Sequence, residues 1–246
     1  MNNKSKSNVG KLYQVSLLQG LLYGDYRGSV TIEELCQNGD IGLGTFDQLN
    51  GELILLDGEA YRATGDGSVE TVPASETTPF AVATHMHTDI TEALCGVADM
   101  DALQSKLNSL VNLRGKNRFY MIRIDGVFDE INVRSVPGQT EPYRPLVEVL
   151  EQEQTFFNFA NVEGSIVGLY CPAYMSYLNA MGWHMHFISK DRTAGGHLLG
   201  IKIANATLTL CDIDTLEVKL PQNNRFHGFD LAVDQTKDIE KVETNK

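Results

Sequence analysis

The same order of elements, a helix, a strand, a turn and a second strand, is predicted twice along this chain. It occupies residues 31–56 in the first half and residues 172–203 in the second. A hairpin must bury one face against another sheet or against helices, so two such units dictate a layered arrangement. The sequence therefore predicts an α+β fold of two related halves, built on mixed or antiparallel β-sheets with a few helices.

Local signals define the elements of the first half. Ser29 or Thr31 can cap a helix that ends near Gly39, and the Asn50-Gly51 pair predicts a hairpin over residues 41–62. Aligning LGTF at 43–46 with HMHF of the second half places Glu52 on the position of a later histidine. The alignment suggests that both hairpins line one site.

Further elements follow from periodicity and turn residues. Residues 98–113 have the spacing of a one-faced helix with Asp99 or Asp101 as its cap, and Asp125-Gly126 predicts a second hairpin between strands at 119–124 and 127–136. In the second half, residues 172–181 are predicted to form a helix opened by proline. The charged segment from Asp234 to Lys246 is expected to be a short terminal helix or a disordered end.

Composition narrows the function. The 246 residues carry a formal net charge of -12 without any basic run, which disfavours a nucleic-acid partner or an anionic membrane. Residues 1–10 are polar, and no stretch reaches the roughly 20 apolar residues of a membrane span. The four cysteines lie far apart, which favours free buried thiols in a reducing compartment. We therefore expect a cytoplasmic protein with a small-molecule substrate.

Three of the six histidines fall between residues 184 and 197. Because side chains on a strand alternate between its two faces, His184 and His186 must project from the same face. His197 follows a run suited to chain reversal, so it can lie across from them on the next strand. Three imidazoles on one face can bind a catalytic zinc ion while leaving positions open for water or substrate. The alternative is three histidines hydrogen-bonded within a half-buried sheet.

A second pair with the same spacing is His85 and His87, followed by Asp89. This pair lacks a third partner at hairpin distance, so we expect it at the surface or near a site rather than in one. His227 lies in an irregular segment and is not expected to be a ligand.

Several segments resemble the α-acetolactate decarboxylase family. The most specific is GWHMHFISKDRTAGGHLLG at 182–200, and the others are GDIGLGTFDQLNGELILLDGEAYR at 39–62, TPFAVAT at 78–84 and VRSVPGQTEPYRPL at 133–146. The resemblance runs from about Leu12 to the C-terminal tail. It implies decarboxylation of 2-acetolactate to acetoin and carbon dioxide in the acetoin and butanediol branch of pyruvate metabolism.

The resemblance also implies roles for individual residues. His184, His186 and His197 match the zinc ligands, and the remaining matches are catalytic: Glu52, Thr45, Arg134 and, from the tail, Glu243, with Glu240 as the fallback. Here His85-Met86-His87 follows the TPF segment, where relatives tend to have apolar or aromatic residues. Loss of the carboxylate leaves electron density that must flow into the neighbouring ketone, and zinc would serve as the Lewis acid.

Two domains are predicted from this assignment. Residues 10–155 would contribute Glu52 and Arg134, and residues 156–246 would carry the three histidines and the tail, with the metal between the hairpins. Exposed hairpin edges favour a homodimer. The alternatives are a different three-histidine metal lyase or hydrolase and a non-catalytic regulatory module, although the latter predicts a basic surface and an incomplete triad.

Overall fold

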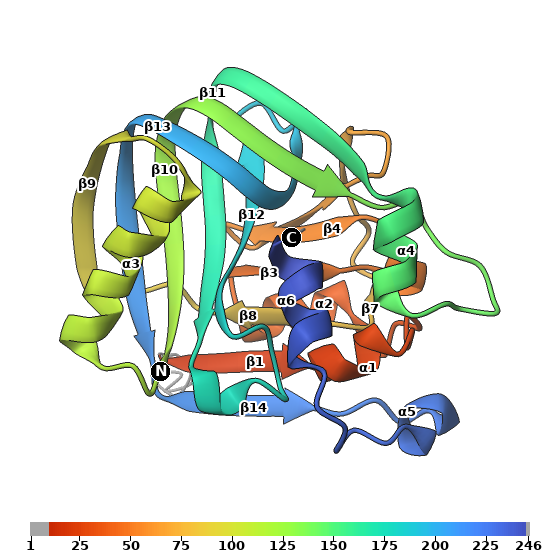
Figure 1. The fold of residues 1–246 in the computed structure, drawn as a ribbon. Coiled ribbons are helices and arrows are strands. Elements are labelled where there is room, and N and C mark those ends of the chain that lie inside the picture. Colours follow the sequence, from red (N-terminus) through yellow and green to blue (C-terminus); the bar gives the residue numbers. More distant parts are fainter. Residues whose placement is uncertain (1–9, 245–246) are drawn as a thin grey trace, which may run out of the picture.

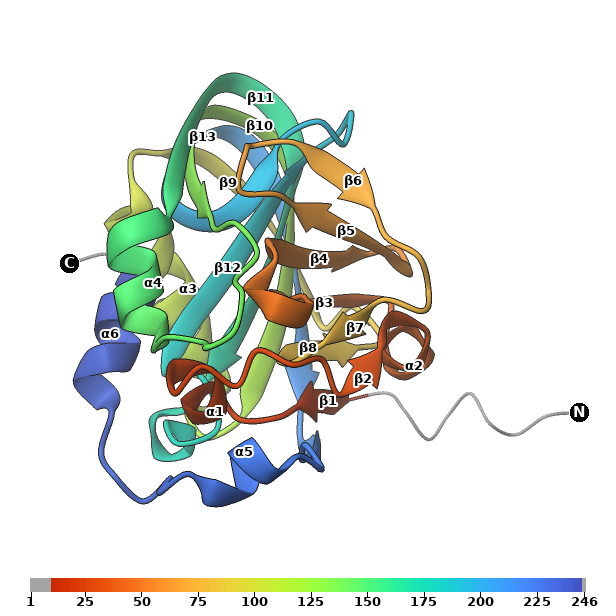
Figure 2. The same ribbon diagram turned by 90° about the vertical axis from the view of Figure 1, so that its right-hand side faces the viewer.

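The computed structural model describes residues 10–244 of the chain (Figure 1). Within this range the strands form a seven-stranded sheet, a five-stranded sheet and a short two-stranded sheet. The helices lie at the ends and outer faces of the sheets (Figure 1, Figure 2). The predicted α+β fold is confirmed.

The seven-stranded sheet holds most of the N-terminal strands. Its spatial order is β14 (Thr215–Lys219), β1 (Lys11–Val15), β8 (Ala81–Thr84), β3 (Ile41–Thr45), β4 (Glu52–Leu56), β5 (Glu59–Ala63) and β6 (Val69–Thr71). The β14–β1 pair is parallel, and the other neighbouring pairs are antiparallel. Beside it, β2 (Val30–Thr31) pairs with β7 (Thr77–Thr78).

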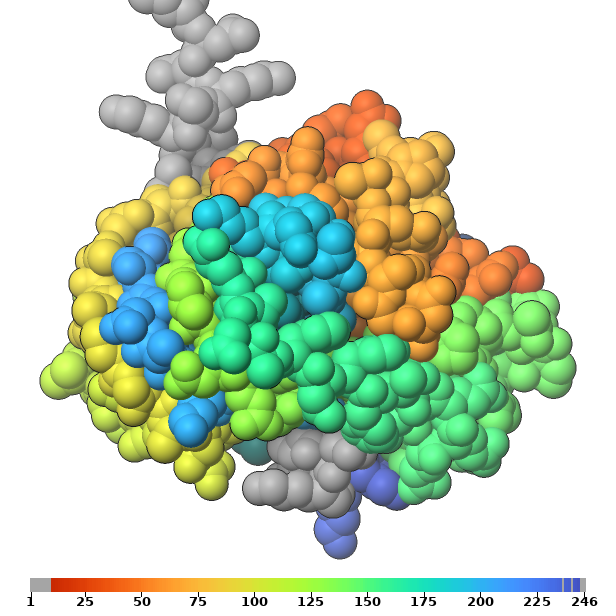
Figure 3. Space-filling view, turned by 90° about the horizontal axis from the view of Figure 1, so that it is seen from above, coloured from red at the N-terminus to blue at the C-terminus, as the bar shows by residue number. Residues whose placement is uncertain are grey.

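The five-stranded sheet is antiparallel and closes on itself. Its order is β10 (Phe119–Ser135), β11 (Thr155–Cys171), β12 (Gly182–Ser189), β13 (Gly195–Ile213) and β9 (Ile90–Val97). Because β10 also pairs with β13, the first four strands form a ring. Seen from above in Figure 3, strands of this ring lie beside the orange strands of the other sheet.

The helices are mostly short. They are α1 (Leu18–Leu22), α2 (Ile32–Asn38), α3 (Met100–Arg114), α4 (Leu146–Glu153), α5 (Asn224–Gly228) and α6 (Thr236–Thr244), with 3-10 turns η1 (Asp47–Leu49) and η2 (Ala173–Met175). Two of the predicted caps are present: Thr31 Oγ1 accepts a hydrogen bond from Glu34 N at the start of α2, and Asp99 Oδ1 accepts from Ala102 N at the start of α3. No helix within residues 10–244 is long and apolar enough to cross a membrane.

Four apolar clusters hold these layers together. One lies between the two large sheets, where Leu43 and Ile54 meet Val167 and Ile188. Another packs α3 onto the outer face of the five-stranded sheet, and a third packs α2 against the seven-stranded sheet. The fourth joins α1, α4 and α6, which together cover one end of the space between the sheets.

Two predicted elements were wrong. Asp125-Gly126 is not a turn, since β10 runs straight through both residues. A Cβ at Gly126 would come 2.4 Å from Asn205 O, so this glycine permits close strand approach within the sheet. Residues 172–181 form only the 3-10 turn η2, and the carbonyl of Leu178 accepts hydrogen bonds from Leu18 N and Gln14 Nε2.

The two predicted segments, 10–155 and 156–246, contribute strands to both large sheets. The division falls after the first residue of β11, and β11 pairs with β10 along almost its whole length. On the other side, β14 of the second segment joins β1 of the first. The segments therefore do not correspond to separate sheets.

Candidate metal and catalytic site

The three histidines of the sequence motif converge at one point between the two large sheets. His184 and His186 project from the same face of β12, and His197 of β13 lies directly opposite His186 in the strand register. This confirms the period-two argument and the hairpin argument together. All three side chains are buried.

The two hairpins contact each other at this point, and their pairing follows the predicted alignment. Thr45 pairs with Glu52 in the β3–β4 hairpin, and the aligned residues His186 and His197 pair in the β12–β13 hairpin. His186 Nδ1 donates a hydrogen bond to the carbonyl of Leu53 on β4 at 2.8 Å. This bond joins the hairpins and fixes the tautomer of His186 with its Nε2 lone pair facing the cluster.

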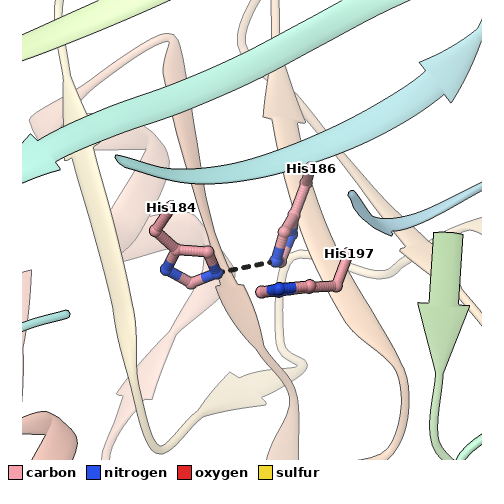
Figure 4. Close-up of side chains that lie close together, drawn as sticks. All are labelled: His184, His186 and His197. Atoms are coloured by element: carbon pink, nitrogen blue, oxygen red, sulfur yellow. Dashed lines mark hydrogen bonds between the residues drawn. The ribbon is translucent and has the colours of Figure 1, made fainter. Parts of the chain in front are cut away.

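The ring nitrogens form a compact group (Figure 4). One ring nitrogen from each histidine lies within 4.8 Å of the others, and the Nε2 atoms of His184 and His186 are 3.1 Å apart. A search of residues 10–244 for three or more His, Cys, Asp or Glu side chains that could hold a metal ion finds these three histidines. The spacing suits nitrogens that share one cation.

Burial determines the charge of the three imidazoles. Desolvation by burial, together with the nearby Arg134 guanidinium, lowers the pKa of His184 to about 3. The pKa values of His186 and His197 are also well below the usual value, mainly because of burial. The histidines are therefore neutral at pH 7, which is the form that binds metal ions.

Two carboxylates approach the histidines from opposite elements. Glu52 Oε2 on β4 lies 3.5 Å from His186 Nε2. Glu243 Oε2 on α6 lies 3.9 Å from His184 Nε2 and 4.0 Å from His197 Nε2. This oxygen is buried and has no hydrogen-bond partner within the described part of the chain. Burial raises the pKa of each carboxyl group to about 7, while Arg134 acts in the opposite direction.

Arg134 is the buried cation of the site. Its strand position on β10 pairs with His197, and its Nη1 lies 3.9 Å from Glu52 Oε1. Its Nη2 donates to the carbonyl of Val242 in α6 at 2.9 Å. Thr45 is buried next to Glu52, and its Oγ1 donates to the carbonyl of Gly51 at 2.7 Å, so it supports the turn that precedes Glu52.

The tail is helical where the structure describes it. Helix α6 packs on α4 and buries Ile239 and Val242, which brings Glu243 to the histidines. The side chain of Glu240, the predicted alternative, is not among those that the structure describes. Among the tail residues whose side chains the structure describes, Glu243 is the glutamate that lies in the site.

The second histidine pair lies elsewhere. His87 Nε2 is 2.9 Å from Asp89 Oδ2, and His85 Nδ1 is 3.7 Å from Asp40 Oδ2, both on the partly exposed surface. His227 is exposed on α5. The cysteines are free, but the expectation of burial holds only for Cys171 and Cys211; Cys36 is half-buried and Cys95 exposed.

Two cavities meet at the site. The inner one, about 40 Å³, is lined by Thr45, Glu52, Arg134, two of the histidines and Glu243, together with apolar side chains of α1, α4 and α6. The outer one, about 310 Å³, lies between α3 and α6 and is also lined by His197 and Glu243.

Sequence reasoning missed two groups of residues in the site. The backbone carbonyl of Leu53 orients His186, and no side-chain pattern reveals a carbonyl. The apolar wall formed by Leu18, Leu21, Leu146 and Leu150 comes from two short helices distant in sequence. The sequence contains an apolar segment at residues 12–24, but the position of this segment over the histidines depends on tertiary packing.

Comparison with known proteins identifies the family. The family model "Alpha-acetolactate decarboxylase" matches residues 12–233. The alpha-acetolactate decarboxylase of Brevibacillus brevis is 36% identical over 244 residues, which cover 99% of this chain and 84% of the relative. The alpha-acetolactate decarboxylase of Methanosarcina mazei is 38% identical over 232 residues, which cover 94% of this chain and 80% of the relative. The crystal structure of the Bacillus subtilis strain 168 enzyme superposes with a TM-score of 0.91 at 37% identity, covering 95% of this chain and 99% of that one. The chain therefore belongs to the alpha-acetolactate decarboxylase family.

Proposed function

We propose that this protein decarboxylates 2-acetolactate to acetoin and carbon dioxide, using one divalent metal ion, zinc, held by His184, His186 and His197. The observation that carries the proposal is the convergence of three neutral, buried imidazoles with Glu52, Glu243 and Arg134. Every one of these residues lies in a family-like segment or in the tail.

The residues present fit a metal ion. His186 is fixed as the tautomer whose Nε2 is a free ligand atom, and the buried Glu243 Oε2 has no hydrogen-bond partner among the described residues. Arg134 supplies one positive charge for two buried carboxyl groups whose pKa values are raised to about 7, so a bound metal cation would allow both to ionise. Nitrogen and oxygen donors with at least one open position are the ligand set of a catalytic zinc site.

The bound metal would supply Lewis-acid stabilisation of the negative charge that develops on the substrate oxygens. Side chains of the protein bind the substrate and exclude water. Arg134 offers a fixed cation to the substrate carboxylate, and its contact with Val242 restricts its movement. The apolar side chains of α1 and α4 keep bulk water from the reacting carbon.

Proton delivery falls to the two glutamates. When the C–C bond to the carboxylate breaks, its electron pair remains on the substrate as an enolate, and one proton must reach carbon to give acetoin. Glu52 Oε2 and Glu243 Oε2 lie on different sides of the histidines, so each can hold a proton at a distinct face.

Cytoplasmic location, a homodimer and the absence of a nucleic-acid partner belong to the same proposal. The net charge of -12 without a basic run supports the absence of a nucleic-acid partner. The free cysteines support a reducing compartment, and the hairpin edges expected from the sequence support the homodimer. A different three-histidine lyase or hydrolase remains the alternative, and substrate turnover separates it from the proposal.

The experiment is acetoin formation from racemic acetolactate by the purified protein, before and after chelation and after adding back zinc or manganese. We expect turnover that disappears in demetallated protein and returns with the metal. No acetoin from the metal-loaded protein would contradict the activity, and unchanged turnover in protein shown to contain no metal would contradict the Lewis-acid role.

A further inference from the structure

The inner cavity is too small to receive the substrate as it stands. Its volume of about 40 Å³ corresponds to space for roughly three water molecules. Acetolactate is a five-carbon acid with four oxygens and needs more room. Access therefore requires either displacement of α6, which covers the histidines, or a route through the larger neighbouring cavity.

The outer cavity results from the way two strands separate. β12 pairs with β13 only over residues 186–188, after which β13 continues along β10 and β9. The edge of β12 from Gly182 to Met185 is left without β13 beside it, and α3 spans the opening. The resulting space of about 310 Å³ reaches from Gln104 on α3 to His197.

The two cavities share a wall that can move. Both are lined by His197 and Glu243, so the Glu243 side chain stands between them. Among the described residues its Oε2 has no hydrogen-bond partner that would hold it in place. A change of the Glu243 side-chain rotamer is the smallest movement that would join the cavities.

Displacing α6 is far more costly. Ile239 and Val242 are buried in the α1–α4–α6 cluster, Arg134 holds the Val242 carbonyl, and Lys241 contacts Glu151 of α4. Exposing two such apolar side chains to water is strongly unfavourable. The open state would then be sparsely populated.

We propose that the substrate reaches the histidines through the outer cavity, past the side chain of Glu243, while α6 stays docked on α4. The proposal rests on the proposed function and adds the route. The outer wall carries one further carboxylate, Asp101, in the first turn of α3, where the positive end of the helix dipole offsets its charge toward an anionic substrate.

The first test fills the passage. Gln104→Trp places a bulky ring in the outer cavity, and Lys106→Trp places the same ring on the exposed face of the same helix. We expect Gln104→Trp to lower kcat/KM at least about tenfold with zinc content unchanged, and Lys106→Trp to leave it at the wild-type value. Ser176→Trp, on the opposite wall, should act like Gln104→Trp and serves if the first variant folds poorly.

The second test holds α6 against α4. In a Cys36→Ser/Cys95→Ser background, Glu151→Cys and Lys241→Cys are joined by a short, cleavable thiol cross-linker that ties α6 to α4. We expect the cross-linked protein to keep the turnover of the same protein after cleavage. Loss of turnover on cross-linking, or equal kcat/KM for Gln104→Trp, Ser176→Trp and Lys106→Trp, would overturn the route. Absence of acetoin from the wild-type protein would instead refute the proposed function.

Discussion

Arg134 Nη2 donates a hydrogen bond to the backbone carbonyl of Val242 at 2.9 Å, although the two residues are 108 positions apart in the chain. A side chain of β10 thereby holds the last turn of the C-terminal helix. The same guanidinium lies 3.9 Å from Glu52. Arg134 thus connects the buried carboxyl group of Glu52 with the helix that carries Glu243.

Replacing Arg134 should affect both connections. Arg134→Met removes a charged hydrogen bond worth roughly 1.5–3 kcal/mol and leaves Glu52 without its cation. We expect kcat/KM to fall by about 100-fold or more and amide hydrogen exchange over residues 236–244 to accelerate. Arg134→Lys should restore part of the activity, because it keeps the charge but not the fork of donors. Unchanged exchange in the Met variant would show that the Val242 contact does not hold α6.

Replacing His184 should remove metal and activity together. His184→Ala deletes one of three converging nitrogens, and we expect zinc content and acetoin formation to fall in parallel. His227→Ala, at an exposed position on α5, is the matched control and should preserve both. A variant that binds a full equivalent of zinc but is inactive would assign His184 a role other than ligand.

Glu243→Gln tests the tail more cleanly than truncation. Deleting residues 238–246 would remove Glu243 but also the buried Ile239 and Val242, so lost folding could be mistaken for lost chemistry. Glu243→Gln keeps the shape and removes the charge and the acid. We expect a loss of about 10²–10⁴-fold in kcat if Glu243 supplies the proton. Turnover within a few-fold of wild type, with Glu52→Gln inactive, would move proton delivery to Glu52.

The stability of the metal-free protein should depend on pH through the buried carboxyl groups. The pKa of Glu52 is raised to about 7 in the folded state from its ordinary 4.5, chiefly by burial. The folded protein therefore retains a proton that the unfolded chain releases, and this contribution to stability is lost as pH rises from about 4.5 to 7. Glu52→Gln lacks the effect.

Thermal unfolding of both metal-free proteins measures this difference. We expect Glu52→Gln to gain stability relative to wild type as pH increases through that window, while the histidine contributions, common to both, cancel. Bound zinc should remove the difference in slope, because a cation favours the charged carboxylate. Parallel stability curves for the two metal-free proteins would mean that Glu52 is already charged in the folded state.

Periodicity alone predicted the centre of the site. The H-M-H spacing required one face for His184 and His186, and the chain reversal before His197 placed it opposite His186, as the strand register confirms. The alignment of the two hairpins also predicted that Glu52 would face the histidines. Such inferences succeed because a strand has a fixed side-chain period and a short turn leaves few registers.

The incorrect predictions concerned segments whose structure depends on contacts with distant parts of the chain. Gly126 has the local appearance of a turn residue, but its function is to let β13 approach β10 closely. Residues 172–181 do not form the expected helix. The carbonyl of Leu178 in this segment accepts hydrogen bonds from Gln14 and Leu18, more than 150 positions away. The position of α6 over the histidines likewise follows from its packing on α4. Local sequence patterns carry none of this information.

The most direct test of the central claim is a crystal structure of the zinc-loaded protein with anomalous data collected above the zinc absorption edge. We predict one strong peak about 2.0–2.1 Å from a nitrogen of each of His184, His186 and His197, with an oxygen ligand completing the shell. A peak bound by His85 and His87 alone, or any of the three histidines turned away from the metal, would contradict the account.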